Sequence, residues 1–272
     1  MLGGLKFADE KGLRAIPSLG RADPYGSTSE GQKGWSWTDY FETASSCGVQ
    51  PVIPKNPAVI GGLQHPYPSI LDLEPAEIRR IFSDHSQIRS EVRKFVEFNA
   101  PFVNGESTLG VHYRAGDMRS YAIHPTPPSE RFMISLIRSE LSTGAYSRIY
   151  VATESKKFIR MVRRAFGNEH EVIHGYKADK SSSARGSYLS DIKVIADAHY
   201  LGACRTLLHS RSNVAWAAFV FSDGTLQKAI EIDLGANPSF APWAIVKGRL
   251  LFHITAPHRE KSATLKTRYM AS

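Results

Sequence analysis

Short apolar runs typical of β-strands alternate with longer amphipathic runs typical of helices between residues 109 and 233. We expect strands at 109–111, 148–153, 172–173, 206–209 and 229–233, and helices at 129–141, 154–166, 187–203 and 213–221. Alternating strands and helices with short connections favour a parallel sheet with right-handed crossovers. The sequence therefore predicts an α/β fold for this part of the chain.

Polar and charged side chains directly follow the first of these strands. His112 and Arg114 are alternate residues, so both lie on one face of the strand at its carboxyl end. Asp117 and Arg119 follow within the next five residues. Ligands of open α/β sheets bind at the carboxyl ends of the strands, which makes this group a candidate binding site. The alternative is a structural ion pair between Arg114 and Asp117.

A second polar group stands between a later strand and the helix that follows it, and contains Ser210, Ser212 and Asn213. A helix N-terminus favours anions, because its unpaired N–H groups and the macrodipole both attract negative charge. We therefore expect this group to bind a phosphate. The alternative is that Ser212 is only the N-cap of the helix. Asp191, about twenty residues earlier, opens the preceding helical pattern.

The charge balance is basic, with 34 Lys and Arg against 26 Asp and Glu and a net charge of +8. It favours anionic ligands, among which phosphate, nucleic acid and a membrane surface are all admissible. The two cysteines have neither the number of a disulfide framework nor the spacing of a zinc site, so we expect neither feature. No apolar run approaches the roughly 20 residues of a membrane span, and the first residues lack the basic start and apolar centre typical of a signal peptide. We expect a cytoplasmic protein if the chain is complete.

Four aromatic residues gather in the segment GWSWTDYFE, namely Trp35, Trp37, Tyr40 and Phe41. Such rings can stack on a sugar, although aromatic clusters more commonly anchor a loop on the core. Asp39 and Glu42 are the nearest carboxylates, and we regard them with the tryptophans as candidates for contact with an acceptor.

Apolar residues recur at helical spacing between residues 74 and 98, with a break near 83–86. This pattern predicts a helical hairpin or a kinked helix. We place an N-terminal domain at 1–105, a second domain at 106–250 and a basic tail at 251–272, because a loop separates the helical stretch from the first strand of the alternating part.

The run HYRAGD, from His112 to Asp117, resembles the H-x-R-x-G/T-D pattern of the fucosyltransferase superfamily. This superfamily includes the α1,6- and α1,2-fucosyltransferases, the nodulation fucosyltransferase and the protein O-fucosyltransferases. The run 191–213 resembles its D-x-x-x-L…S-S-x region, and GWSWTDYFE resembles its W-x-x-Y/F-F segment. The resemblance covers roughly residues 35–233 and is strongest from 109 to 217.

The resemblance implies a GT-B-like fold of two Rossmann-like domains that face each other across a cleft, here with a short N-terminal domain. It also implies an inverting, metal-independent transfer of fucose from the donor substrate GDP-fucose to a hydroxyl of a glycan or protein acceptor. No cofactor is implied, and we expect no nucleic acid partner. The acceptor itself is not named by the resemblance.

The resemblance also implies roles for single residues. Arg114 would contact the diphosphate and stabilise the leaving GDP, with Arg119 as a second basic residue, while His112 and Asp117 would shape the loop and touch the donor. Asp191 would read the guanine edge, and Ser210 and Ser212, in the segment that includes Asn213, would hold the β-phosphate. The catalytic base stays open between Asp117, Asp39 and Glu42.

The chain departs from the family pattern at two positions, Tyr113 and Arg211, and the serine segment is shifted by a few residues relative to Asp191. Two alternatives therefore accompany the fucosyltransferase hypothesis. One is a GT-B transferase that uses another nucleotide sugar, or a degenerate member without turnover. The other is a basic module that binds RNA or another polyanion.

Overall fold

The computed structural model describes residues 41–43, 74–101, 105–114, 125–143, 146–175, 188–235 and 258–270. These residues group into two compact units. The first unit contains β1 (Phe41–Thr43), α4 (Pro75–His85), β2 (Ser86–Ile88), α5 (Ser90–Phe98) and the start of α8 (Tyr188–Gly202). The second contains the remaining elements and includes both polar groups predicted from the sequence, the one after residue 111 and the one at residues 210–213.

In the first unit, β1 pairs with β2 in antiparallel fashion, and Phe41 lies opposite Ile88. Phe41 is buried and meets the Phe82 ring edge-on, so this residue of the aromatic segment packs in a core. The predicted break in the helical pattern near 83–86 is confirmed. A strand, and not a simple turn, separates α4 from α5, because Ser86–Ile88 pairs with β1.

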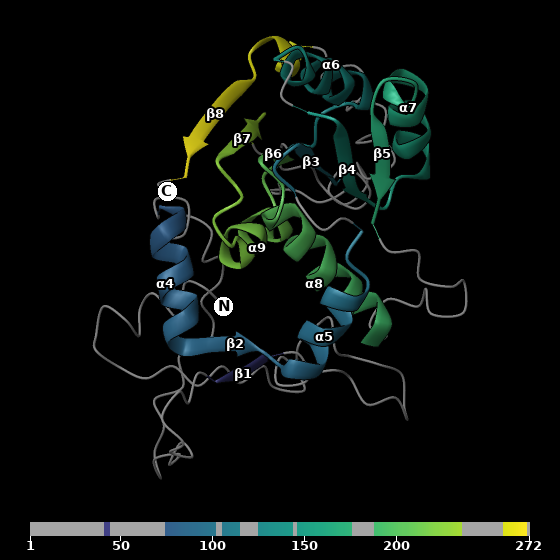
Figure 1. Cartoon of the computed structure of the whole chain (residues 1–272). Coiled ribbons are helices and arrows are strands. Elements are labelled where there is room, and N and C mark those ends of the chain that lie inside the picture. Colours follow the sequence, from purple (N-terminus) through teal and green to yellow (C-terminus); the bar gives the residue numbers. More distant parts are fainter. Residues whose placement is uncertain are drawn as a thin grey trace, which may run out of the picture. The chain divides into compact units, whose positions relative to one another are not determined.

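The second unit contains a six-stranded sheet in the order β5-β4-β3-β6-β7-β8 (Figure 1). The strands are β3 (Thr108–Tyr113), β4 (Arg148–Thr153), β5 (Glu171–His174), β6 (Thr206–Ser210), β7 (Lys228–Asp233) and β8 (Thr264–Tyr269). Strands β3 to β7 are parallel, which confirms the predicted parallel sheet, and β8 runs antiparallel to β7. The protein is thus α/β with a mostly parallel central sheet.

Helices cover both faces of this sheet. On one face, α6 (Glu130–Leu141) and α7 (Lys156–Phe166) bury an apolar cluster that includes Val111, Val151 and Leu208. On the other face lie α8 and α9 (Asn213–Phe221), where Tyr200 meets the ring of Tyr150 and Phe219 meets that of His209. Figure 1 shows these two pairs of helices on opposite sides of the sheet. Successive residues of β3 therefore alternate between two different environments.

Three of the described helices have a serine as their N-cap. Each of them, Ser129, Ser155 and Ser212, accepts through its Oγ atom one hydrogen bond from the N–H group three residues later in the chain, at 3.1 to 3.2 Å. These side chains satisfy backbone donors that would otherwise lack a partner at the start of α6, α7 and α9. Each of these helices therefore begins directly after its serine.

The C-terminal stretch contributes the last strand of the sheet. Residues 264–269 form β8, whose Thr267 lies opposite Ile230 of β7. Most β8 side chains are exposed, so the stretch lacks the alternation of apolar residues by which a strand is predicted. Pairing with β7 determines its conformation.

We expect Gly110→Ala to destabilise the second unit, because a Cβ at this position in β3 would lie 3.0 Å from Sγ of Cys204. The expected loss is about 1–3 kcal/mol in the free energy of unfolding, measured by urea denaturation. Cys204→Ala removes the nearest of the crowding atoms and leaves Cβ of residue 204 at 3.1 Å, so the glycine substitution should cost less in that background. Equal costs in both backgrounds would contradict this packing of Cys204 against β3.

Candidate functional site

The strand order of the sheet reverses between β3 and β6. From β3 the chain moves outward through β4 to β5, and it then crosses back to β6 on the other side of β3. In doubly wound sheets, ligands bind outside the carboxyl ends of the strands at such a reversal. The carboxyl ends here are Tyr113, followed by Arg114, and Ser210, followed by Arg211. The two polar groups predicted from the sequence therefore follow neighbouring strands.

His112 and Ser212 connect these two strand ends. Oγ of Ser212 lies 3.2 Å from Nδ1 of His112 and accepts a hydrogen bond from the N–H of Ala215. Burial, together with smaller effects of His209 and of the positive charge of Arg114, lowers the pKa of His112 to about 3. His112 is neutral, and the direction of this hydrogen bond depends on its tautomer; we assign the Ser212 hydroxyl as the donor to Nδ1, which leaves the proton on Nε2. His112 is thus suited to donate a hydrogen bond, and not to exchange protons near neutral pH.

Two further polar residues, which the sequence analysis did not identify, lie in line with His112 on the next two strands and form with it a polar row across the sheet. His209 lies beside His112 on β6, and Glu231 lies beside His209 on β7; each is 1% exposed. Burial lowers the pKa of His209, whereas Glu231 acts in the opposite direction. Within the described residues, Nε2 of His209 and Oε2 of Glu231 have no hydrogen-bond partner. The available signal was a histidine and a glutamate inside otherwise apolar strands.

The other predicted residues of these strand ends are arranged differently. Arg114 is partly buried directly after β3, and its charge acts on His112. Ser210 is buried opposite Ile232, which places it on the α6 and α7 face of the sheet, away from the row of His112. Asn213 is exposed at the start of α9. The structure therefore brings His112, Arg114 and Ser212 to one place and turns Ser210 toward the opposite face.

Several predicted site residues fall outside the described part of the chain. Asp117, Arg119, Trp35, Trp37 and Asp39 lie outside the described residues. Glu42 in β1 and Asp191 in α8 belong to described elements, but their side chains are not described. The proposed roles of all seven stay predictions.

Tyr113, one of the two departures from the family pattern, has a structural explanation. Its ring is fully buried on the α6 and α7 face, with its centroid 4.2 Å from that of Phe158. Its hydroxyl donates a hydrogen bond to the carbonyl of Pro128. Because position 113 faces the core, a charged residue here would have to be buried, and a tyrosine fits without this cost.

Asp197 of α8 is a carboxylate that sequence reasoning also missed. The Tyr150 hydroxyl donates to its Oδ1 at 2.7 Å, and the backbone of Gly175 lies so close that a Cβ there would clash with the carboxylate. Burial raises the pKa of Asp197 to about 6, against the lowering effects of Tyr150 and Lys193. Leu201 follows four residues later, so this pair fits the D-x-x-x-L spacing, whereas Ile195 occupies that place after Asp191. This four-residue spacing was the signal in the sequence that could have drawn attention to Asp197.

Among the described residues, no three His, Cys, Asp or Glu side chains gather in a way that would hold a metal ion. The helices of the same residues are too short or too polar to cross a bilayer. The expectation that the chemistry needs no metal stays a prediction.

No family model and no curated protein sequence matches the chain. Its structure is similar to that of the NodZ α-1,6-fucosyltransferase soaked with GDP-fucose, with 19% identity and a TM-score of 0.41 over 62% of this chain and 52% of that one. POFUT1 in complex with GDP-fucose has 11% identity and a TM-score of 0.37, over 53% and 44% of the two chains. A variant of Arabidopsis thaliana FUT1 in complex with GDP has 10% identity and a TM-score of 0.39, over 56% and 36%. The chain spans about half the length of the first of these structures, and less of the other two.

The lowered pKa of His112 should make stability depend on pH. In the unfolded chain this pKa is about 6.5, so the unfolded state binds more protons than the folded state between that value and about 3. The free energy of unfolding should therefore fall as the pH falls in this window, by up to about 1.4 kcal/mol per pH unit for each such histidine.

We expect His112→Asn, which keeps an acceptor for Ser212, to reduce this slope in urea denaturation measured from about pH 6 to pH 4. His258→Asn, which changes an exposed histidine, is the matched control and should leave the slope unchanged. The same slope in wild type and His112→Asn would contradict a buried, neutral His112.

Proposed function

We propose that the chain is a fucosyltransferase-like enzyme that binds GDP-fucose at the carboxyl ends of β3 and β6. It transfers fucose, with inversion and without a metal, to a hydroxyl of a glycan or protein acceptor. The hydrogen bond between His112 and Ser212 is the observation that supports this proposal most, because it joins two family-like motifs at the strand reversal where ligands bind. The choice of GDP-fucose comes from the motif resemblance.

Arg114 is the proposed catalytic residue. Loss of the sugar leaves negative charge on the β-phosphate of GDP, so a fixed guanidinium stabilises the transition state more than the bound substrate. Arginine suits this task, since its planar group binds two phosphate oxygens at once. The N–H groups at the start of α9 and the Nε2–H of His112 are oriented donors that complement it.

Guanine recognition requires a carboxylate that accepts from N1 and N2 of the base. Asp191 is the proposed residue by its place in the motif region. Asp197 is a second candidate, because it has the D-x-x-x-L spacing. Its Oδ1 accepts the hydrogen bond from Tyr150, and Oδ2 is the oxygen proposed to accept from the base. With its pKa raised to about 6, Asp197 is mostly ionised at neutral pH, as this contact requires.

The remaining parts of the proposal concern the whole enzyme. The donor would lie between two Rossmann-like domains of a GT-B-like fold, and the acceptor would approach from the N-terminal one, near Trp35, Trp37, Asp39 and Glu42. Asp117, Asp39 and Glu42 are the candidates for the catalytic base. These assignments rest on the resemblance of the motifs.

One observation favours a second function, the binding of a polyanion. The exposed side of α7 carries only basic charged residues, namely Lys156, Lys157, Arg160, Arg163 and Arg164. Such a surface attracts phosphate backbones without specificity, and binding of this kind weakens steeply as salt is added. The aromatic residues of α7, Phe158 and Phe166, are buried. This helix therefore lacks the exposed rings on which proteins that bind single-stranded nucleic acid stack the bases.

Calorimetric titration with GDP, GDP-fucose, UDP and ADP, first without metal and then with magnesium, tests the proposed donor site. We expect selective binding of the guanine nucleotides in the absence of metal. Arg114→Ala should weaken GDP binding and reduce transfer by about 10²- to 10³-fold, because one oriented donor to the leaving group is lost.

Arg160→Ala removes an exposed arginine of α7 and serves as the matched control, with unchanged GDP binding expected. Weak binding of all nucleotides alike, with steep salt dependence that Arg160→Ala reduces, would support the polyanion function instead. No nucleotide binding at all would contradict the proposed donor site and leave a degenerate fold or a polyanion binder.

A further inference from the structure

Arg211, the second departure from the family pattern, is held by two carboxylates at the end of β6. Its Nε and Nη2 atoms both lie 3.2 Å from Oε1 of Glu231, and Nη2 also lies 3.2 Å from Oδ2 of Asp233. Both carboxylates belong to β7, the neighbouring parallel strand. The guanidinium is thus bound along one edge by groups that a rigid sheet fixes.

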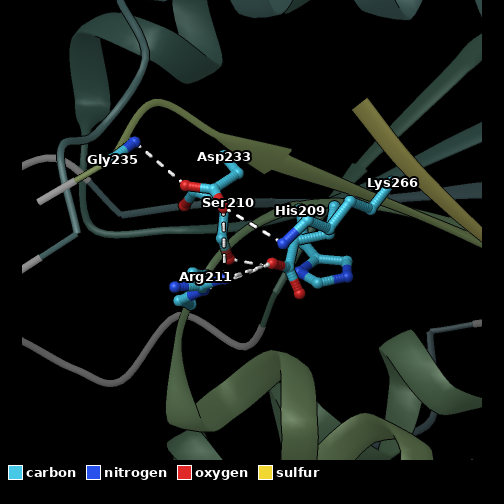
Figure 2. Close-up of polar contacts among 7 residues, drawn as sticks. His209, Ser210, Arg211, Asp233, Gly235 and Lys266 are labelled. Carbon is cyan, nitrogen blue, oxygen red and sulfur yellow. Dashed lines mark hydrogen bonds and ion pairs between the residues drawn. The ribbon is translucent and has the colours of Figure 1, made fainter. Parts of the chain in front are cut away.

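Asp233 is fixed in turn by other groups. Its Oδ1 accepts from the N–H of Gly235 at 2.9 Å, and Nζ of Lys266 in β8 lies 3.3 Å from its Oδ2 (Figure 2). Burial opposes ionisation of Asp233, but the Gly235 N–H, Arg211 and Lys266 outweigh it and lower the pKa of the carboxyl. Asp233 therefore stays charged at neutral pH and holds Arg211 in one orientation.

The opposite edge of the guanidinium is not used by these contacts. Within the described part of the chain, the hydrogen bonds of Arg211 run from Nε and Nη2, and none runs from Nη1. The side chain is 21% exposed, so part of it reaches solvent. An arginine needed only to neutralise Glu231 would not require a second carboxylate to fix its direction.

Arg211 stands between Ser210 and the helix cap Ser212, at the strand end where the donor phosphates are proposed to lie. The four charged groups of the network, Arg211, Lys266, Glu231 and Asp233, sum to zero. A diphosphate would therefore meet oriented N–H donors and not a concentration of charge, which favours geometric selection of the phosphate over general attraction of anions.

We infer that Arg211 is a further donor-binding residue, whose Nη1 group donates hydrogen bonds to the diphosphate of the bound nucleotide. Glu231 and Asp233 are positioning residues that hold the guanidinium for this contact. The inference rests on the proposed function, and it adds a phosphate contact at a position where the family pattern has none.

Calorimetric affinities of the full chain for guanosine, GMP and GDP separate a phosphate contact from a structural role. We expect Arg211→Ala to weaken GDP binding by roughly 10- to 100-fold and to leave guanosine binding unchanged, because hydrogen bonds to charged groups are lost only with the phosphates. Equal GDP affinities in wild type and variant would overturn the inference, as would an equal loss for guanosine and GDP.

Arg211→Ala leaves Glu231 buried without its counter-charge, which is strongly destabilising. The double variant Arg211→Gln with Glu231→Gln removes both charges and keeps an amide pair, so it provides a second measurement if the single variant does not fold. We expect the same loss that is specific for the phosphates. GDP binding by the double variant with wild-type affinity would overturn the inference.

Arg160→Ala is the matched control, since it removes an exposed arginine of α7 and leaves the network of Arg211, Glu231, Asp233 and Lys266 in place. Its GDP affinity should stay within about twofold of wild type, because a charge exposed to solvent is screened by salt. If wild type binds neither GMP nor GDP, the proposed function fails and the inference with it. If wild type binds GDP and the Arg211 variants bind it with the same affinity, the inference fails and the proposed function stands.

Discussion

The pairing of β3 with β6 is the constraint on which the rest of the site depends. These strands are far apart in the sequence, and their parallel register sets His112 beside His209. The Ser212 hydroxyl then reaches Nδ1 of His112 from the start of α9. One side chain thus caps a helix, contacts Nδ1 of a buried histidine, and joins two strand ends at the reversal of the sheet.

The polar row across the sheet shows how the fold tolerates ionisable groups in its interior. The two histidines are kept neutral by burial, so they cost little electrostatically. Glu231 is different, because a buried carboxylate needs a cation, and Arg211 supplies it from the next strand end. The charges of the row are therefore concentrated at the carboxyl edge, where a ligand of the sheet would bind.

Local signals predicted much of the second unit from the sequence. β4 and α9 have the expected bounds, because apolar runs with clear caps or turns on both sides determine them. The position of β8 was not predictable, since its exposed side chains give no pattern and only pairing with β7 makes it a strand. The contact of Arg211 with Glu231 joins residues 20 apart in the chain, and neither residue alone announces it. The spacing of Asp197 and Leu201 was visible but was assigned to Asp191.

A crystal structure of the chain with GDP, grown without metal, tests the central claim most directly. The account predicts a nucleotide across the carboxyl ends of β3 and β6, with its phosphates against Arg114, Ser212 and the start of α9. It would also show whether Asp191 or Asp197 contacts the guanine. A nucleotide bound elsewhere, or none at concentrations that saturate binding in solution, would contradict the proposal that this sheet edge is a donor site.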